Sequence, residues 1–163
     1  MDAWLLHPVP GWPVSQRFGV NRQWYPPFTL RNGQRWPGGH EGLDLATPLG
    51  TPVRAAHDGV ITEVTRVPAY KRVLRKTQPP YGENLRIETQ HEGNRITTIY
   101  AHLDHLAPWV KRGLPVDAGA IIGFSGNTGR VLGDQTKGYH LHFGVNENDY
   151  PVDPAPLIMP EAS

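Results

Sequence analysis

The sequence contains no cysteine. This absence excludes a catalytic thiol, a disulfide and a cysteine-based structural zinc site. It leaves the cellular compartment open, because a chain without cysteine is stable under both reducing and oxidising conditions. Any nucleophile, base or metal ligand must therefore come from other residue types.

The chain also lacks a dominant charge, a membrane-length apolar run and a signal-like start. Its formal net charge is +1, so nucleic acid is not an expected partner. No run approaches the ~18 apolar residues of a membrane span, and we expect no membrane insertion. The first residues, Met1-Asp2-Ala3-Trp4, lack the basic start, apolar run and cleavage site of a signal peptide. We therefore expect a soluble monomer without a targeting segment of its own.

Short apolar runs between turn signals make up most of the 163 residues. With 18 glycines and 17 prolines, this pattern predicts a single all-β domain over residues 1–163. The clearest hairpin joins residues 85–89 to residues 96–100, because both segments alternate with period two. Further strands are expected at residues 14–19, 53–56, 59–65, 121–124 and 138–144.

Two segments do not fit this pattern. Residues 21–39 are rich in aromatic residues, proline and glycine, which predicts a long, packed loop. In that loop Trp24, Tyr25 and Trp36 either cover an edge of the core or wall a groove. Residues 66–80 are expected to form a solvated loop, because they carry five basic residues: Arg66, Lys71, Arg72, Arg75 and Lys76.

The stretch His140-Leu141-His142-Phe143 is the first candidate for chemistry. In a strand, His140 and His142 point to the same face, about 6–7 Å apart along the backbone. Leu141 and Phe143 then point to the core. The stretch is either a strand with two half-buried histidines or part of a site that binds a metal or a water.

His40 and Asp44 form a second candidate pair. Gly38, Gly39 and Gly42 disfavour a helix here, so we expect both side chains on one side of a loop-to-strand segment. The alternative is a loop histidine beside an aspartate that accepts backbone N–H groups.

Together the two segments offer one aspartate and three histidines, a ligand set suited to zinc. A catalytic zinc needs an open coordination position, so one histidine of the His140/His142 pair should be free to act as a base. The residues alone predict a zinc hydrolase and do not say which histidine is free. Of the five other histidines, surface or turn roles are expected for four: His7, His57, His91 and His105.

The sequence contains three separated motifs: His40-x-x-x-Asp44, Tyr100-Ala101-His102-Leu103 and His140-Leu141-His142-Phe143. Their order and approximate spacing resemble those of the lysostaphin-type (LytM-like) zinc metallopeptidases, which are peptidoglycan endopeptidases. The glycine-containing turns between them also match: Gly50-Thr51-Pro52-Val53, Asp58-Gly59-Val60, Tyr81-Gly82-Glu83-Asn84 and residues 122–129. The chain resembles this family from about residue 7 to residue 155.

The resemblance implies an antiparallel β-sheet sandwich core, with long loops that wall a groove and one Zn²⁺ at its floor. By position, His40, Asp44 and His142 would be the zinc ligands. His102 and His140 would bind and activate water and stabilise the tetrahedral intermediate. The groove candidates are Trp24, Tyr25, Trp36 and Tyr139.

The implied substrate is peptidoglycan, so the enzyme would act on the cell wall, in the periplasm or outside the cell. Because the chain has no signal-like start, it would be an excised catalytic domain or reach the wall by phage-type delivery. Three segments depart from the family pattern: residues 20–39 are longer, residues 66–80 look like an insertion, and residues 135–139 replace a Ser-Thr-Gly-Pro-like run. These departures leave open whether Gly-Gly bridges or D-Ala-to-diamino-acid cross-links are cut, and whether the basic insertion contacts anionic wall polymers.

Two rival interpretations remain at this stage. One is a zinc-free LytM-like module that regulates cell-wall amidases by binding; such relatives lack some of the five site residues, all of which are present here. The other is an unrelated zinc hydrolase. Glu88-x-x-His91 resembles an element of the D-Ala-D-Ala carboxypeptidases, but in a strand these two side chains point to opposite faces.

Overall fold

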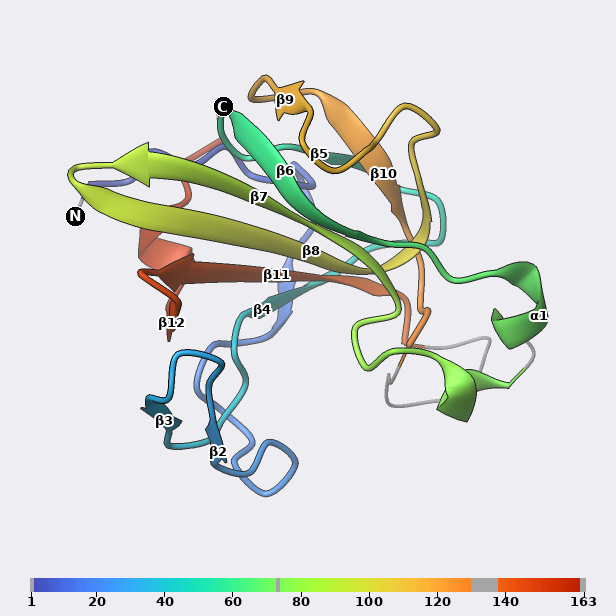
Figure 1. The fold of residues 1–163 in the computed structure, drawn as a ribbon, viewed down its shortest axis with the longest axis horizontal. Coiled ribbons are helices and arrows are strands. Elements are labelled where there is room, and N and C mark those ends of the chain that lie inside the picture. Colours follow the sequence, from blue (N-terminus) through green and yellow to red (C-terminus); the bar gives the residue numbers. More distant parts are fainter. Residues whose placement is uncertain (1, 73, 130–137, 162–163) are drawn as a thin grey trace.

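The computed structural model describes residues 2–72, 74–129 and 138–161. Ten strands form one sheet in which the paired strands are antiparallel (Figure 1). They are β1 (Val14–Gln16), β4 (Leu43–Ala46), β5 (Pro52–Arg54), β6 (Gly59–Thr65), β7 (Glu83–His91), β8 (Asn94–Leu106), β9 (Pro115–Val116), β10 (Ile121–Ser125), β11 (His140–Glu147) and β12 (Tyr150–Val152). A separate hairpin joins β2 (Phe28–Thr29) to β3 (Arg35–Trp36).

The sheet branches at β8. The first part of β8 pairs with β7 on one side and β11 on the other, whereas its last residues, from Leu103 onward, pair with β10. One arm continues from β11 through β4 to β1, and the other continues from β10 to β5 (Figure 1). Val53 and Ile122 from the second arm belong to the same buried cluster as Leu85 and Phe143. The two arms therefore share one core.

The all-β prediction is confirmed, and each predicted strand is present at or near its expected place. The central hairpin is longer than residues 85–89 and 96–100 because backbone pairing continues to His91 and Asn94 at its turn and to Glu83 and Leu103 at its base. Leu5 and Leu157 also join the core.

The segment 21–39 contains regular structure that its sequence does not suggest. Phe28 pairs with Trp36 in the β2–β3 hairpin, and the hairpin turn carries Arg31, which forms an ion pair of 2.9 Å with Glu63 on β6. The side chain of Arg31 is 81% exposed. The hairpin is thus attached to the main sheet by a surface ion pair.

The segment 66–80 is not simply a solvated loop. It contains the helix α1 (Ala69–Arg72) and a 3₁₀ turn, η1 (Arg75–Thr77). Arg66 donates hydrogen bonds to the carbonyl oxygens of Ala107 and Val110, and Arg72 forms an ion pair with the buried Glu83. The expectation of a solvated basic run is therefore wrong for Arg72, whose charge is paired with a buried carboxylate. Arg66 is exposed although it donates these hydrogen bonds.

The two terminal segments lie side by side. Leu5 bridges Ile158, and the backbone N–H of Met159 donates to the carbonyl of Leu5 at 2.8 Å. A short 3₁₀ turn, η2 (Ala155–Leu157), precedes this contact. Among the described residues, no helix is long and apolar enough to cross a membrane.

Candidate metal centre and active site

Strand register brings Asp44 and His142 together. His142 lies opposite Asp44 in the β11–β4 pair and opposite Ala101 in the β11–β8 pair. Directly opposed residues share a face of the sheet, so His142, Asp44 and His140 point to the same side. Leu141, which lies opposite Leu45, is fully buried in the core. The predicted alternation of faces along residues 140–143 is therefore present.

Gly42 makes room for the ring of His142. A Cβ atom at position 42 would lie 2.5 Å from the carbonyl oxygen of Phe143 and 3.0 Å from Cε1 of His142. Any larger residue would displace the start of β4 from β11. The glycine between His40 and Asp44 is thus required by the close approach of the two strands.

Three potential ligand atoms form a nearly equilateral triangle. His40 Nε2 lies 3.1 Å from Asp44 Oδ1, His142 Nδ1 lies 3.2 Å from Asp44 Oδ1, and the two nitrogens lie 3.1 Å apart. A tetrahedral zinc ion with bonds of about 2.0–2.1 Å separates its ligand atoms by roughly 3.3–3.4 Å. Within the described ranges, no other group of three His, Cys, Asp or Glu ligand atoms is as close. The triangle therefore fits a zinc ion with little rearrangement.

The protonation states of these residues also suit a cation. His40 Nδ1 donates a hydrogen bond to the carbonyl of Arg17 at 3.1 Å, which leaves the Nε2 lone pair directed at the triangle. Burial lowers the pKa of His142 and keeps its ring neutral. Burial alone would raise the pKa of Asp44, but the close contacts with His142 and His40 outweigh this effect and hold that pKa well below its usual range. Neutral imidazoles and an ionised carboxylate are the forms that bind zinc.

His102 and His140 lie beside the triangle. Their ring centroids are 4.9 Å apart. Each ring donates its Nδ1–H to a backbone carbonyl, His102 to Thr128 at 2.7 Å and His140 to Gly138 at 2.6 Å. His140 Nε2 lies 3.7 Å from Asp44 Oδ1. Both side chains therefore carry their proton on Nδ1 when neutral, which leaves each Nε2 able to accept another.

The buried position of His102 has an electrostatic consequence. Burial, together with the repulsion that His140 and His142 exert when protonated, lowers the pKa of His102 to about 3. The ring is therefore neutral at neutral pH. A neutral imidazole with an unprotonated Nε2 has the form required of a general base.

The triangle opens into a cavity of about 930 Å³. Trp24, Tyr25 and Tyr139, three of the four groove candidates, line it. Trp36 does not line it: its side chain is 4% exposed, packs against Phe18 and Tyr150, and donates its indole N–H to the carbonyl of Gly39. For Trp36 the structure matches the alternative interpretation, a residue that covers an edge of the protein interior.

Several residues that support the centre had no role in the sequence interpretation. The ring of Tyr81 stacks on His142 at 5.1 Å, and its hydroxyl donates to Glu41 at 3.2 Å. Burial raises the pKa of Tyr81, so this hydroxyl stays protonated. Gln16 donates to the second carboxylate oxygen of Asp44 at 3.3 Å. Tyr81 belongs to a turn that resembles the family, Tyr81-Gly82-Glu83-Asn84, but no short-range pattern indicates that Tyr81 or Gln16 reaches the centre, because each comes from a distant segment.

The four remaining histidines lie outside the triangle. His57 occupies a turn but is buried, with hydrogen bonds to the Asp58 carbonyl and to Thr98 Oγ1. His91 stacks on Trp4, and His105 pairs with Asp104 at the surface.

The departure from the family pattern noted at residues 135–139 falls partly outside the part of the chain that the structure describes, because positions 135–137 are not among the described residues.

The chain is similar in sequence to known peptidases. The sequence profile of peptidase family M23 matches residues 38–154. Peptidoglycan DD-endopeptidase ShyA of Vibrio cholerae is 35% identical over 153 residues, which cover 91% of this chain and 31% of ShyA. The chain thus spans about a third of the length of this relative.

Solved structures with the same fold include two peptidases. A zinc-containing peptidase from Vibrio cholerae superposes with a TM-score of 0.67 at 30% identity, over 98% of this chain and 41% of that one. The catalytic domain of lysostaphin from Staphylococcus simulans superposes with a TM-score of 0.63 at 26% identity, over 91% of this chain and 92% of that one. The resemblance to lysostaphin-type peptidases is confirmed, and the chain belongs to peptidase family M23.

Proposed function

We propose that this chain is a zinc-dependent endopeptidase that hydrolyses peptide cross-links or stem peptides of bacterial peptidoglycan. One observation carries the proposal: three donor atoms lie 3.1–3.2 Å from one another at a cavity that also holds two further histidines. The substrate class follows from the family and from relatives named as peptidoglycan endopeptidases. Action on the cell wall follows from the substrate.

In this proposal His40, Asp44 and His142 are the protein ligands of one Zn²⁺. Two neutral nitrogens and one carboxylate leave the centre with a net positive charge. A bound zinc ion would polarise the scissile carbonyl and lower the pKa of the attacking water. Gln16 orients the carboxylate of Asp44, and Arg17 fixes the tautomer of His40.

His102 and His140 are the proposed catalytic residues. His102 accepts a proton from the attacking water at Nε2, because its Nδ1–H is already bound to the Thr128 carbonyl. Its neighbour His140 presents a second Nε2 near the triangle. A protonated imidazole at either position then stabilises the developing oxyanion and returns the proton to the leaving amine.

The cavity supports an extended peptide substrate. Its lining includes the triangle residues, Ile99 and Asn146 of the sheet, and residues 28–31 of the hairpin segment. Trp24, which is 64% exposed, stands at its edge and offers an aromatic face to the substrate. The hairpin and Tyr139 are therefore the proposed determinants of substrate preference.

The test is a pair of substitutions assayed on purified sacculi. His142→Ala should lose zinc and hydrolysis together. His102→Ala should retain stoichiometric zinc yet release no soluble fragments. His105→Ala, at an exposed histidine outside the centre, is the matched control and should retain both. Normal digestion by His102→Ala would contradict the mechanism.

The rival function, an amidase-regulating module without catalysis, gives a different result. Such a protein would copurify without stoichiometric zinc and would release no fragments in its unsubstituted form. An active chain should lose hydrolysis when a chelator removes zinc and regain it when zinc is restored. Mass spectrometry of the released fragments then identifies the bond, either Gly-Gly or D-Ala to a diamino acid.

A further inference from the structure

The backbone of His102 has a conformation that its surroundings must maintain. Its φ angle is +60°, in the left-handed region, where a non-glycine residue costs about 1–3 kcal/mol. Its N–H donates to the carbonyl of Tyr81 at 2.8 Å, and its own carbonyl accepts the N–H of Gly126 at 3.1 Å. Its side chain donates to the carbonyl of Thr128. Two loops, residues 79–82 and 126–129, supply all three partners.

These two loops pack directly on each other. A Cβ atom at Gly82 would collide with the backbone of Thr128, and one at Gly129 would collide with the backbone of Gly82. Gly129 also donates its N–H to the buried side chain of Gln78 at 2.6 Å. A displacement of one loop would therefore displace the other and the imidazole that lies between them.

Thr128 connects the two packed loops to the sheet through hydrogen bonds. Its hydroxyl accepts the backbone N–H of Glu83 at 3.0 Å and donates to the carbonyl of Leu103 at 2.6 Å. Leu103 directly follows His102. Thr128 therefore contacts His102 through its own carbonyl and the neighbouring residue through its hydroxyl.

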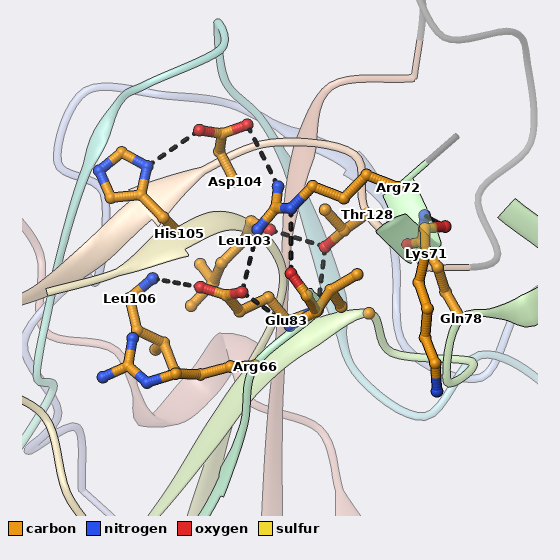
Figure 2. A network of polar contacts seen from close by, with 12 residues as sticks. Arg66, Lys71, Arg72, Gln78, Glu83, Leu103, Asp104, His105, Leu106 and Thr128 are labelled. Atoms are coloured by element: carbon orange, nitrogen blue, oxygen red, sulfur yellow. Dashed lines mark hydrogen bonds and ion pairs between the residues drawn. The ribbon is translucent and has the colours of Figure 1, made fainter. Parts of the chain in front are cut away.

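The carboxylate of Glu83 extends the network to residues 66–72. Glu83 is 3% exposed, and one carboxylate oxygen accepts hydrogen bonds from the N–H of Val67 at 2.9 Å and from Arg72 at 3.0 Å. The other oxygen accepts the N–H of Leu106 at 2.6 Å. Figure 2 shows Glu83 between Arg72, Leu106 and Thr128. Because all the carboxylate's partners are donors, an amide of the same shape cannot satisfy them.

We propose that Glu83, held by Arg72, is a positioning residue that acts through Thr128 to fix the tautomer and orientation of His102. This inference rests on the proposed function, since it concerns the group assigned there as a base. It also assigns a role to the inserted segment: α1 contributes Arg72, which neutralises a buried carboxylate next to the active site. The rival explanation is that Glu83 only stabilises the fold.

Two isosteric substitutions and one conservative variant distinguish these explanations. Glu83→Gln removes the negative charge, and Thr128→Val removes the hydroxyl while leaving the carbonyl that His102 contacts. Thr128→Ser keeps the hydroxyl and should behave as the unsubstituted chain. Arg66→Ala is the control: Arg66 also anchors the inserted segment, through Ala107 and Val110, but is not hydrogen-bonded to Glu83 or Thr128.

Each zinc-loaded chain is measured for zinc content, for kcat and KM on a soluble peptidoglycan fragment, and for the His102 tautomer by ¹⁵N NMR. Glu83→Gln and Thr128→Val should keep zinc and lose about 10- to 100-fold in kcat, with KM changed by no more than about twofold. Their His102 signals should show a mixture of Nδ1–H and Nε2–H forms. The unsubstituted chain, Thr128→Ser and Arg66→Ala should show the Nδ1–H form alone.

The proposal is overturned if folded Thr128→Val keeps both the kcat and the single tautomer, or if Thr128→Ser loses as much kcat as Thr128→Val. If Glu83→Gln does not fold, the comparison of Thr128→Val with Thr128→Ser still tests whether the Thr128 hydroxyl positions His102. An inactive unsubstituted chain would overturn the proposed function, whereas the tautomer measurement would still decide this inference.

Discussion

The two halves of the candidate site are held by different kinds of structure. Asp44 and His142 face each other across a regular antiparallel pair, so the register of β4 and β11 sets their separation. His102 instead has a left-handed backbone and is held by loops at residues 79–82 and 126–129. The ligand half should therefore respond to changes in strand pairing, and the His102 half to changes in loop packing.

The largest effect is expected at the ligand half, from Asp44→Asn. The amide has the same shape but removes the one negative charge of the triangle. Zinc affinity should fall by more than the roughly 10- to 100-fold typical of residues that only support a ligand, and hydrolysis should disappear with it. Isothermal titration with zinc measures the change, and a variant with unaltered zinc affinity would remove Asp44 from the ligand set.

A pair of glycine substitutions separates the two halves. Gly42→Ala should push β4 away from β11, cost about 1–3 kcal/mol of stability and weaken zinc binding. Gly82→Ala should be destabilising to a similar extent, because a Cβ there meets Thr128, but it should leave zinc binding intact while kcat falls. Urea unfolding and zinc titration measure both.

The control for the glycine pair is Gly33→Ala. Gly33, like Gly82, has a positive φ, yet a Cβ there has no neighbour within 4 Å. Gly33→Ala should therefore lose stability only through the backbone strain of an alanine with a positive φ. If Gly42→Ala and Gly82→Ala had the same effect on zinc affinity, the division of the site into two differently held halves would be wrong.

A smaller effect is expected from His57, which lies outside both halves. Burial lowers its pKa below the ordinary 6.5, although the hydrogen bond and charge of Asp58 partly oppose this. As the pH falls below about 6.5, the unfolded chain takes up a proton that the folded chain refuses, so stability should fall by at most about 1.4 kcal/mol per pH unit. Above about pH 6.5, His57 is neutral in both the folded and the unfolded chain, and its full contribution to stability is present.

His57→Gln should reduce this acid sensitivity and keep a hydrogen bond to Thr98. The measurement is the free energy of unfolding in urea at pH 7.5 and at pH 5.5, for both chains. Equal losses in the two chains between these pH values would show that His57 is not a source of the acid sensitivity.

The smallest effect is expected from Arg31→Ala in the β2–β3 hairpin. Its ion pair with Glu63 is largely exposed, so its loss should cost no more than about 0.5 kcal/mol and less at high salt. Zinc binding and kcat should not change, whereas KM for a long substrate should, because Arg31 lines the cavity. An unchanged KM for every substrate would leave the hairpin without a role in recognition.

The difference between the halves also explains what could be predicted from the sequence. Period-two alternation placed His140 and His142 on one face and Leu141 in the core, and the spacing of His40 from Asp44 suited the same face. The family resemblance then added His102. Two segments distant in the sequence, residues 40–44 and 140–143, meet at the ligand half, and each carries a short motif of its own.

Glu83 and Thr128 lie in two glycine-containing turns that resemble the family, Tyr81-Gly82-Glu83-Asn84 and residues 122–129, but these turns do not indicate a role at the site. Glu83 and Thr128 are 45 residues apart, and nothing in the local sequence around either one indicates that they meet beside His102. The basic run at 66–80 suggested a solvated loop because sequence composition does not show that Arg72 has a buried partner. Trp36 was grouped with Trp24 for its aromatic character, yet its neighbours Phe18 and Tyr150 bury it.

The most direct test of the central claim is an anomalous diffraction measurement at the zinc absorption edge on crystals of the zinc-loaded chain. We predict one anomalous peak about 2.0–2.1 Å from His40 Nε2, Asp44 Oδ1 and His142 Nδ1. A peak elsewhere, or no peak at this triangle in crystals grown with excess zinc, would contradict the assignment of the metal centre.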